Sequence, residues 1–152
     1  MFPFKKILCP TDFSEPSLCG IKMGNDMADK YGSEIIIVNV HKPIPKLPTP
    51  RGDVPEVTFD ITGYETEVIK DAERNLATLS GSILSDNVTP KLVVRLGRPA
   101  EEILKVAEEE DVDAICIATH GRTGLAHIVF GSVAQRVVRR AHCVVVTVPR
   151  CD

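Results

Sequence analysis

Apolar residues along the chain fall into short continuous runs and longer stretches in which they recur every three or four positions. Continuous aliphatic runs are typical of strands buried on both faces, and the longer spacing is typical of helices that bury one face. The runs predict five strands, over residues 5–9, 34–40, 91–96, 113–119 and 143–148. The helical spacing predicts one helix before each of the last four strands.

Local signals place the helix ends. Ser14 is a good N-cap with Pro16 in the first turn, Gly32 stands where a helix would end, and Pro99 begins the third helix. The apolar faces are expected to contain Leu18, Ile21, Met27, Ala28 and Tyr31 in the first helix, Tyr64, Val68, Ala72, Leu76, Leu79 and Ile83 in the second, Ile103, Val106 and Ala107 in the third, and Val133, Val137, Val138 and Ala141 in the last.

Strands that alternate with helices predict an α/β fold with a parallel sheet covered on both faces. We expect one domain over residues 1–152, an open doubly wound five-stranded sheet in the order 3-2-1-4-5. Residues 41–59 contain five prolines and predict a long loop that is free to act as a lid, because neither a helix nor a central strand tolerates that density.

Composition narrows the class of protein. A net charge of -3 gives no reason to expect a nucleic acid partner, and no apolar run approaches membrane-spanning length. The first residues lack the pattern of a signal peptide. The five cysteines are odd in number and show no CxxC spacing, so we expect reduced thiols in a cytoplasmic protein, with Cys9 and Cys116 packed in the core.

The segment after the fourth strand is the first candidate for chemistry. A loop with several glycines ends at Gly131-Ser132, where the last helix is expected to begin. The N-terminus of a helix offers unpaired N–H groups and a partial positive charge that suit a phosphate, and Ser132 would either cap the helix or bond a phosphate oxygen. A tight turn with a cap explains the same pattern, and the spacing alone does not decide.

The order 3-2-1-4-5 reverses between the first and fourth strands, and ligands of such sheets bind at that point, beyond the carboxyl ends of the strands. Residues 10–14 leave the first strand there, so Asp12 would face the loop that contains Gly121. An acid in this place accepts from ribose hydroxyls or an adenine amino group. The alternative is that Asp12 caps the first helix alongside Ser14.

Together these residues resemble the universal stress protein family, from the first strand to Val148. ATP-binding members show a glycine, two residues, a glycine, nine residues, and a glycine followed by serine or threonine. Here Ala118 stands in place of the first glycine, whereas Gly121, Gly131 and Ser132 match. Residues 10–14 and 97–103 are similar to the family's first loop and to the start of its third helix.

The resemblance implies a regulatory stress-response module that binds ATP with Mg²⁺ as a signal or structural ligand. It places adenine and ribose near Asp12 and Val40, against Ile117 and Ala118. The phosphates would lie on the glycine loop and the helix start. The ATP-binding residues expected are Pro10, Thr11, Asp12, Val40, Ile117, Ala118, Gly121, Arg122, Gly131, Ser132 and Val133. Arg122 is included for its place in the glycine loop, and the alternative for it is a solvated side chain.

Two other functions stay open. One is a nucleotide-independent adaptor of the same fold with an empty site, which Ala118 favours. The other is a slow ATP hydrolase, for which His120 and His127 lie near the loop. No Walker lysine pattern and no base with an orienting partner is found, so we name no catalytic residue. The spacing of His41, His120, His127 and His142 fits no metal site.

The sheet edges predict how copies would associate. In the expected order, the third and fifth strands are the edges. The third has Lys91 and Arg95, and charges discourage edge pairing, whereas residues 143–148 have none. We expect a homodimer through the fifth strand, which the family resemblance also implies. The alternative is a monomer whose edge is covered by a helix or by residues 41–59.

Overall fold

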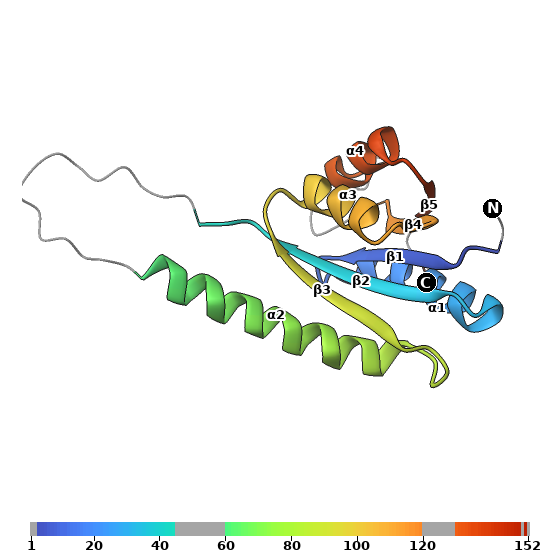
Figure 1. Ribbon diagram of the computed structural model, residues 1–152, viewed down its shortest axis with the longest axis horizontal. Coiled ribbons are helices and arrows are strands. Elements are labelled where there is room, and N and C mark those ends of the chain that lie inside the picture. Colours follow the sequence, from blue (N-terminus) through green and yellow to red (C-terminus); the bar gives the residue numbers. More distant parts are fainter. Residues whose placement is uncertain (1–2, 45–59, 120–129, 150, 152) are drawn as a thin grey trace, which may run out of the picture.

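The computed structural model describes residues 3–44, 60–119, 130–149 and 151. These residues form a five-stranded parallel sheet in the order β3-β2-β1-β4-β5, so the predicted α/β fold and strand order are confirmed. Figure 1 shows α1 and α2 on one face of the sheet and α3 and α4 on the other. The elements are β1 (Lys6–Thr11), α1 (Glu15–Tyr31), β2 (Glu34–His41), α2 (Ile61–Ile83), β3 (Pro90–Leu96), α3 (Pro99–Glu109), β4 (Ala114–Ala118), α4 (Ser132–Arg140) and β5 (Val144–Val148).

Side chains that alternate along the central strands build one apolar core on each face of the sheet. Leu8 and Ile115 belong to the core under α3 and α4, and Ile7 and Cys116 belong to the core under α1 and α2. All four side chains are fully buried. A sheet buried on both faces needs apolar residues at every position, which explains the continuous runs in the sequence.

The two central thiols behave as core residues, as predicted. Cys9 and Cys116 are 0% exposed and hydrogen-bond to each other across β1 and β4. That hydrogen bond, together with burial, raises the pKa of Cys9 well above its usual value. Cys9 is therefore held as a protonated thiol.

Strands β1 and β4 are tied together at their amino ends. The Asp113 carboxylate, just before β4, accepts hydrogen bonds from the backbone N–H groups of Lys5 and Lys6 at 2.8 and 2.9 Å. These two bonds lower the pKa of Asp113. The register between the strands then runs only through Ile7 and Leu8, whereas β1 pairs with β2 over its whole length. The sheet therefore opens between β1 and β4 toward their carboxyl ends.

Helix α1 lies directly on the backbone of β4 because glycine stands at the contact. A Cβ on Gly20 would lie 2.9 Å from the carbonyl oxygen of Cys116 and 3.3 Å from the nitrogen of Ala118. Gly24, one turn later, leaves room for the Cys9 sulfur in the same way. This approach fixes the height of α1 above the carboxyl end of the sheet.

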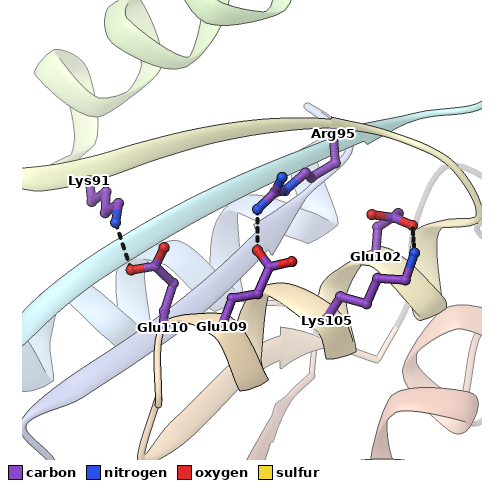
Figure 2. A network of polar contacts seen from close by, with 6 residues as sticks. All are labelled: Lys91, Arg95, Glu102, Lys105, Glu109 and Glu110. Atoms are coloured by element: carbon purple, nitrogen blue, oxygen red, sulfur yellow. Dashed lines mark hydrogen bonds and ion pairs between the residues drawn. The ribbon is translucent and has the colours of Figure 1, made fainter.

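Ion pairs attach the edge strand β3 to α3 (Figure 2). The Lys91 ammonium donates to Glu110 at 2.6 Å and lowers the pKa of that carboxyl, and Arg95 pairs with Glu109. Lys105 pairs with Glu102 within α3 at 2.6 Å, and this hydrogen bond raises the lysine pKa. Lys91 and Arg95, the charged residues expected to discourage pairing at this edge, thus also form ion pairs with carboxylates at the end of α3.

Most predicted helix boundaries hold, including Gly32, which ends α1 in the left-handed conformation. Three residues predicted on apolar faces are exposed, and one of them is Tyr31, the last residue of α1. Tyr64 is 49% exposed because the first half of α2 extends beyond the sheet (Figure 1), and Val138 is 44% exposed because the short α4 buries Ala134 and Val137 instead. The proline-rich residues 45–59 lie outside the described residues.

The expectation of reduced thiols is wrong for two cysteines. Cys19, on α1, forms a disulfide with Cys151, at a Cα–Cα distance of 5.7 Å. The two residues are 132 positions apart, so no local spacing reveals the pair. Cys9, Cys116 and Cys143 are free.

Among the described helices, none combines the length and the hydropathy needed to cross a bilayer.

Substituting alanine for Gly20 is expected to destabilise the fold. The added methyl would press on strand backbone that cannot move aside, at a cost of about 1–3 kcal/mol. In the matched control, Gly81→Ala in α2, the new Cβ meets no atom within 4 Å. Gly81→Ala should raise the free energy of unfolding by about 0.5–1 kcal/mol. Urea unfolding followed by circular dichroism measures both changes, and equal stabilisation by the two variants would contradict the close contact.

Candidate functional site

A cavity of about 480 Å³ opens at the carboxyl end of the sheet, between β1, β2 and β4 and the first turns of α3 and α4. This is the position predicted from the reversal of strand order. Nine of the residues proposed for ATP binding line it: Pro10, Thr11, Asp12, Val40, Ile117, Ala118, Gly131, Ser132 and Val133. The other two, Gly121 and Arg122, lie outside the described residues, as do His120 and His127.

The cavity exists because β1 and β4 part beyond Leu8 and Ile115. Pro10 follows two residues later and has no N–H with which to continue the ladder. The loops that leave the two strands are therefore free to take different directions, and the space between them is not filled by backbone pairing. This is the crevice at which ligands of doubly wound sheets bind.

One wall of the cavity is apolar. Val38 and Val40 of β2 and Ile117 of β4 lie on the face covered by α3 and α4, and Pro99 and Ile103 of α3 complete the lining. A slot with aliphatic walls and a few polar groups at its rim suits a flat, partly apolar ligand such as a nucleobase.

The opposite rim is a turn that is rigidly hydrogen-bonded. Asp12 Oδ1 accepts from the backbone N–H of Ser14 at 3.0 Å and also from the Ser14 hydroxyl. Ser14 occupies the N-cap of α1, but its side chain makes no capping bond to the helix, so the predicted capping role of its hydroxyl is wrong. Thr11 Oγ1 and Ser17 Oγ are 2.8 Å apart and link the end of β1 to the first turn of α1.

Phe13 lies inside this turn at a φ of 64°, in the left-handed region that residues with side chains rarely adopt. Such a conformation costs about 1 kcal/mol or more and persists where surrounding bonds enforce it. Here the Phe13 N–H is held at 3.0 Å by Thr11 Oγ1. The strain positions the Asp12 carboxylate at the cavity, so turn formation and ligand contact are compatible roles for this residue.

The start of α4 forms the third side of the site. Gly131 is the N-cap, with extended backbone and no side-chain capping bond. Its N–H donates to the Thr119 carbonyl at 2.7 Å, and the Thr119 N–H donates to the Val148 carbonyl at 2.9 Å. Ser132, Val133 and Ala134 follow at the cavity, where the first-turn N–H groups of a helix have no partner within the helix. The arrangement suits an anion.

Asn39 is a site residue that the sequence analysis missed. Its side-chain amide donates to the Thr11 carbonyl at 2.8 Å, and the residue is only 2% exposed. It fixes the end of β1 against β2 at the edge of the cavity. The available signal was a polar residue inside the apolar run of residues 35–40.

The remaining lining residues that the prediction omitted come from elements that tertiary packing brings together. Their positions follow from the strand order and from which helix covers which face, and not from any local motif. They are Ser17, Val38, His41, Lys42, Pro99, Ile103, Thr119 and Ala134. Lys42 adds an exposed cation to the rim, directly after β2.

Ala118 departs from the family glycine at the end of β4. Side chains alternate along a strand, so its methyl group shares the α1 face with Cys116, whereas Ile117 faces the apolar wall. Gly20 of α1, which lacks a side chain, lies against the backbone of this residue. The methyl group is thus directed toward α1, and the apolar slot keeps its width.

Comparison with known proteins agrees with this geometry. The model of the universal stress protein family matches residues 3–149. Universal stress protein MJ0577 of Methanocaldococcus jannaschii is 29% identical, covering 97% of this chain and 96% of that protein. A universal stress protein of Methanothermobacter thermautotrophicus is 32% identical over 93% of each chain.

Solved structures show the same fold. The structure of MJ0577 superposes with a TM-score of 0.79 and covers 97% of both chains. A universal stress protein solved in complex with cAMP superposes with a TM-score of 0.63 at 18% identity, covering 97% of this chain and 98% of that one. The family model spans nearly the whole chain, from before β1 to beyond β5, and this chain therefore belongs to the universal stress protein family.

Proposed function

We propose that the protein binds ATP together with Mg²⁺ and acts as a regulatory module in which the nucleotide is a signal or a structural ligand. The observation that carries the proposal is the cavity, which joins an apolar slot to a helix start at the point where the strand order reverses. The neighbour solved in complex with cAMP supports it, since a protein of this fold binds an adenine nucleotide.

The two ends of the cavity suit the two ends of the ligand. Adenine would lie in the slot between Val40 and Ile117, with the ribose toward Asp12. Asp12 Oδ1 is engaged by Ser14, and an ionised carboxylate has acceptor sites to spare for a ribose hydroxyl. In this orientation the phosphates would lie at the α4 start, which also lines the cavity.

The phosphate end would use backbone more than side chains. N–H groups at residues 132–134 supply donors, and the partial positive charge of the helix favours the anion. Lys42 at the rim adds a cation, and Arg122 is proposed as a second one because of its place in the glycine loop. Mg²⁺ in such sites is bound mainly by phosphate oxygens and water, so a dedicated cluster of carboxylates is not required.

Binding without rapid hydrolysis is the expected behaviour. Among the lining residues that the structure describes, Asp12 is the single carboxylate, and the Ser14 backbone and hydroxyl engage its Oδ1. General-base catalysis needs a group free to accept a proton beside the attacking water. We propose a turnover well below about 1 per second, the low end of typical enzymes.

ATP binding is tested by replacing Gly131. A Cβ at this position would already lie 3.3 Å from the Thr119 carbonyl, so valine would displace the helix start from the phosphates. We expect Gly131→Val to weaken ATP binding about tenfold or more, the equivalent of about 1.4 kcal/mol, while adenosine binding changes little. Calorimetry with both ligands measures this. Absence of binding by the wild type at ~1 mM ATP and Mg²⁺, where even weak sites fill, would favour the adaptor with an empty site.

A second variant tests whether Ala118 closes the site. Because its methyl group is directed toward α1, Ala118→Gly should leave ATP affinity within about twofold, or about 0.4 kcal/mol, of the wild type. Thermal denaturation provides the control, since glycine in a strand should lower stability. A large gain in affinity would show that alanine narrows the binding site and would support the adaptor.

We also propose a homodimer through β5. This edge strand is uncharged, and Val144 is 37% exposed. The Val144 N–H and the Val148 carbonyl both face β4, so by alternation the polar groups of Val145 and Thr147 face outward. Pairing with a second copy about a two-fold axis would satisfy those groups.

Thr147→Pro should therefore convert a dimer to a monomer, because it removes an outward N–H while the bonds to β4 remain. Thr147→Ala is the matched control, since it keeps that N–H and should stay dimeric. Light scattering at ~100 μM protein, far above a micromolar dissociation constant, reads out both variants. A monomeric wild type at that concentration would refute the interface.

A further inference from the structure

The disulfide between Cys19 and Cys151 joins α1 to the segment that follows β5. Cys19 is 3% exposed on α1, whereas Cys151 is exposed and lies three residues beyond the end of β5. The Cys151 N–H donates to Cys19 Sγ at 3.0 Å. The bond thus attaches the segment after β5 to helix α1.

On the α1 side, the bond is attached close in sequence to a residue of the cavity wall. Cys19 lies between Ser17, which lines the cavity and bonds Thr11, and Gly20, whose backbone rests on the carboxyl end of β4. A displacement of this turn of α1 would move the loop that holds Asp12.

On the β5 side, the bond is anchored next to a chain of backbone hydrogen bonds. The Val148 carbonyl holds the Thr119 N–H, and the Thr119 carbonyl holds the N–H of Gly131, which begins α4. A displacement of the end of β5 would therefore reach the helix start on the other side of the cavity. The disulfide restrains both sides of the site at once.

We propose that the Cys19–Cys151 disulfide is a redox-sensitive clasp on this site, so that its reduction weakens nucleotide binding. The inference rests on the proposed ATP binding and adds its regulation. In the cytoplasm, the location expected from the sequence, such a bond would be exposed to thiol reductants.

The reaction is an ordinary thiol–disulfide exchange with a dithiol reductant. A reductant thiolate attacks the Sγ of exposed Cys151, the S–S bond breaks, and Cys19 leaves as a thiolate that takes up a proton. The Cys151 N–H bond to Cys19 Sγ favours the developing negative charge. The second reductant thiol then displaces Cys151, which yields two protein thiols and an oxidised reductant.

The test compares the oxidised protein with protein reduced by dithiothreitol, using ATP and Mg²⁺ in calorimetry. We expect the reduced form to bind ATP at least about fivefold more weakly than the oxidised form. This is the lower end of typical couplings between sites. Cys151→Ser should bind like the reduced form and stop responding to the reductant. Cys143→Ser, which removes a free cysteine, should respond like the wild type.

Hydrogen exchange gives a readout that does not depend on nucleotide. Opening of the clasp should speed exchange of the Thr119 and Gly131 amides, while the central amides of β2 stay protected. Equal ATP affinity in the two redox forms would overturn the inference whatever the exchange rates. If neither form binds ATP, the proposed function fails, and unchanged exchange at Thr119 and Gly131 would then overturn the clasp as well.

Discussion

The site depends on one constraint, the early end of pairing between β1 and β4. Asp113 ties the two strands at their amino ends, and the ladder stops after Leu8. Beyond that point the two strands lead into two separate loops. Pro10 and Ala118, which follow on the two strands, line the cavity together with the starts of α3 and α4.

The close packing of α1 on β4 explains how the chain tolerates a departure from its family. Gly20 and Gly24 bring the helix down to the strands, so the backbone at Ala118 is supported from behind by main chain. The same contact makes α1 a rigid support for the Asp12 turn, which is held by Thr11, Ser14 and Ser17. The packing of α1 on the sheet therefore also determines the geometry of the site.

The sequence was sufficient for the elements and their order because each strand is a continuous apolar run and each helix has a regular apolar face. It placed Asp12 and Gly131 because strand ends and helix starts are read locally. It missed Asn39 and Ser17, whose roles come from bonds to Thr11 on another element. It also missed the Cys19–Cys151 pair, since two residues 132 positions apart show no periodicity.

The ion pairs between β3 and α3 have a consequence for the size of any assembly. A sheet with two open edges can recruit copies at both ends and grow into a filament. Lys91 and Arg95 make the β3 edge unsuitable for such growth, and their carboxylate partners hold the strand to its own helix (Figure 2). If copies pair through β5 as proposed, each copy offers one edge and two copies that meet there use up both. The charges on the far side of the molecule would then limit association through strands to two copies.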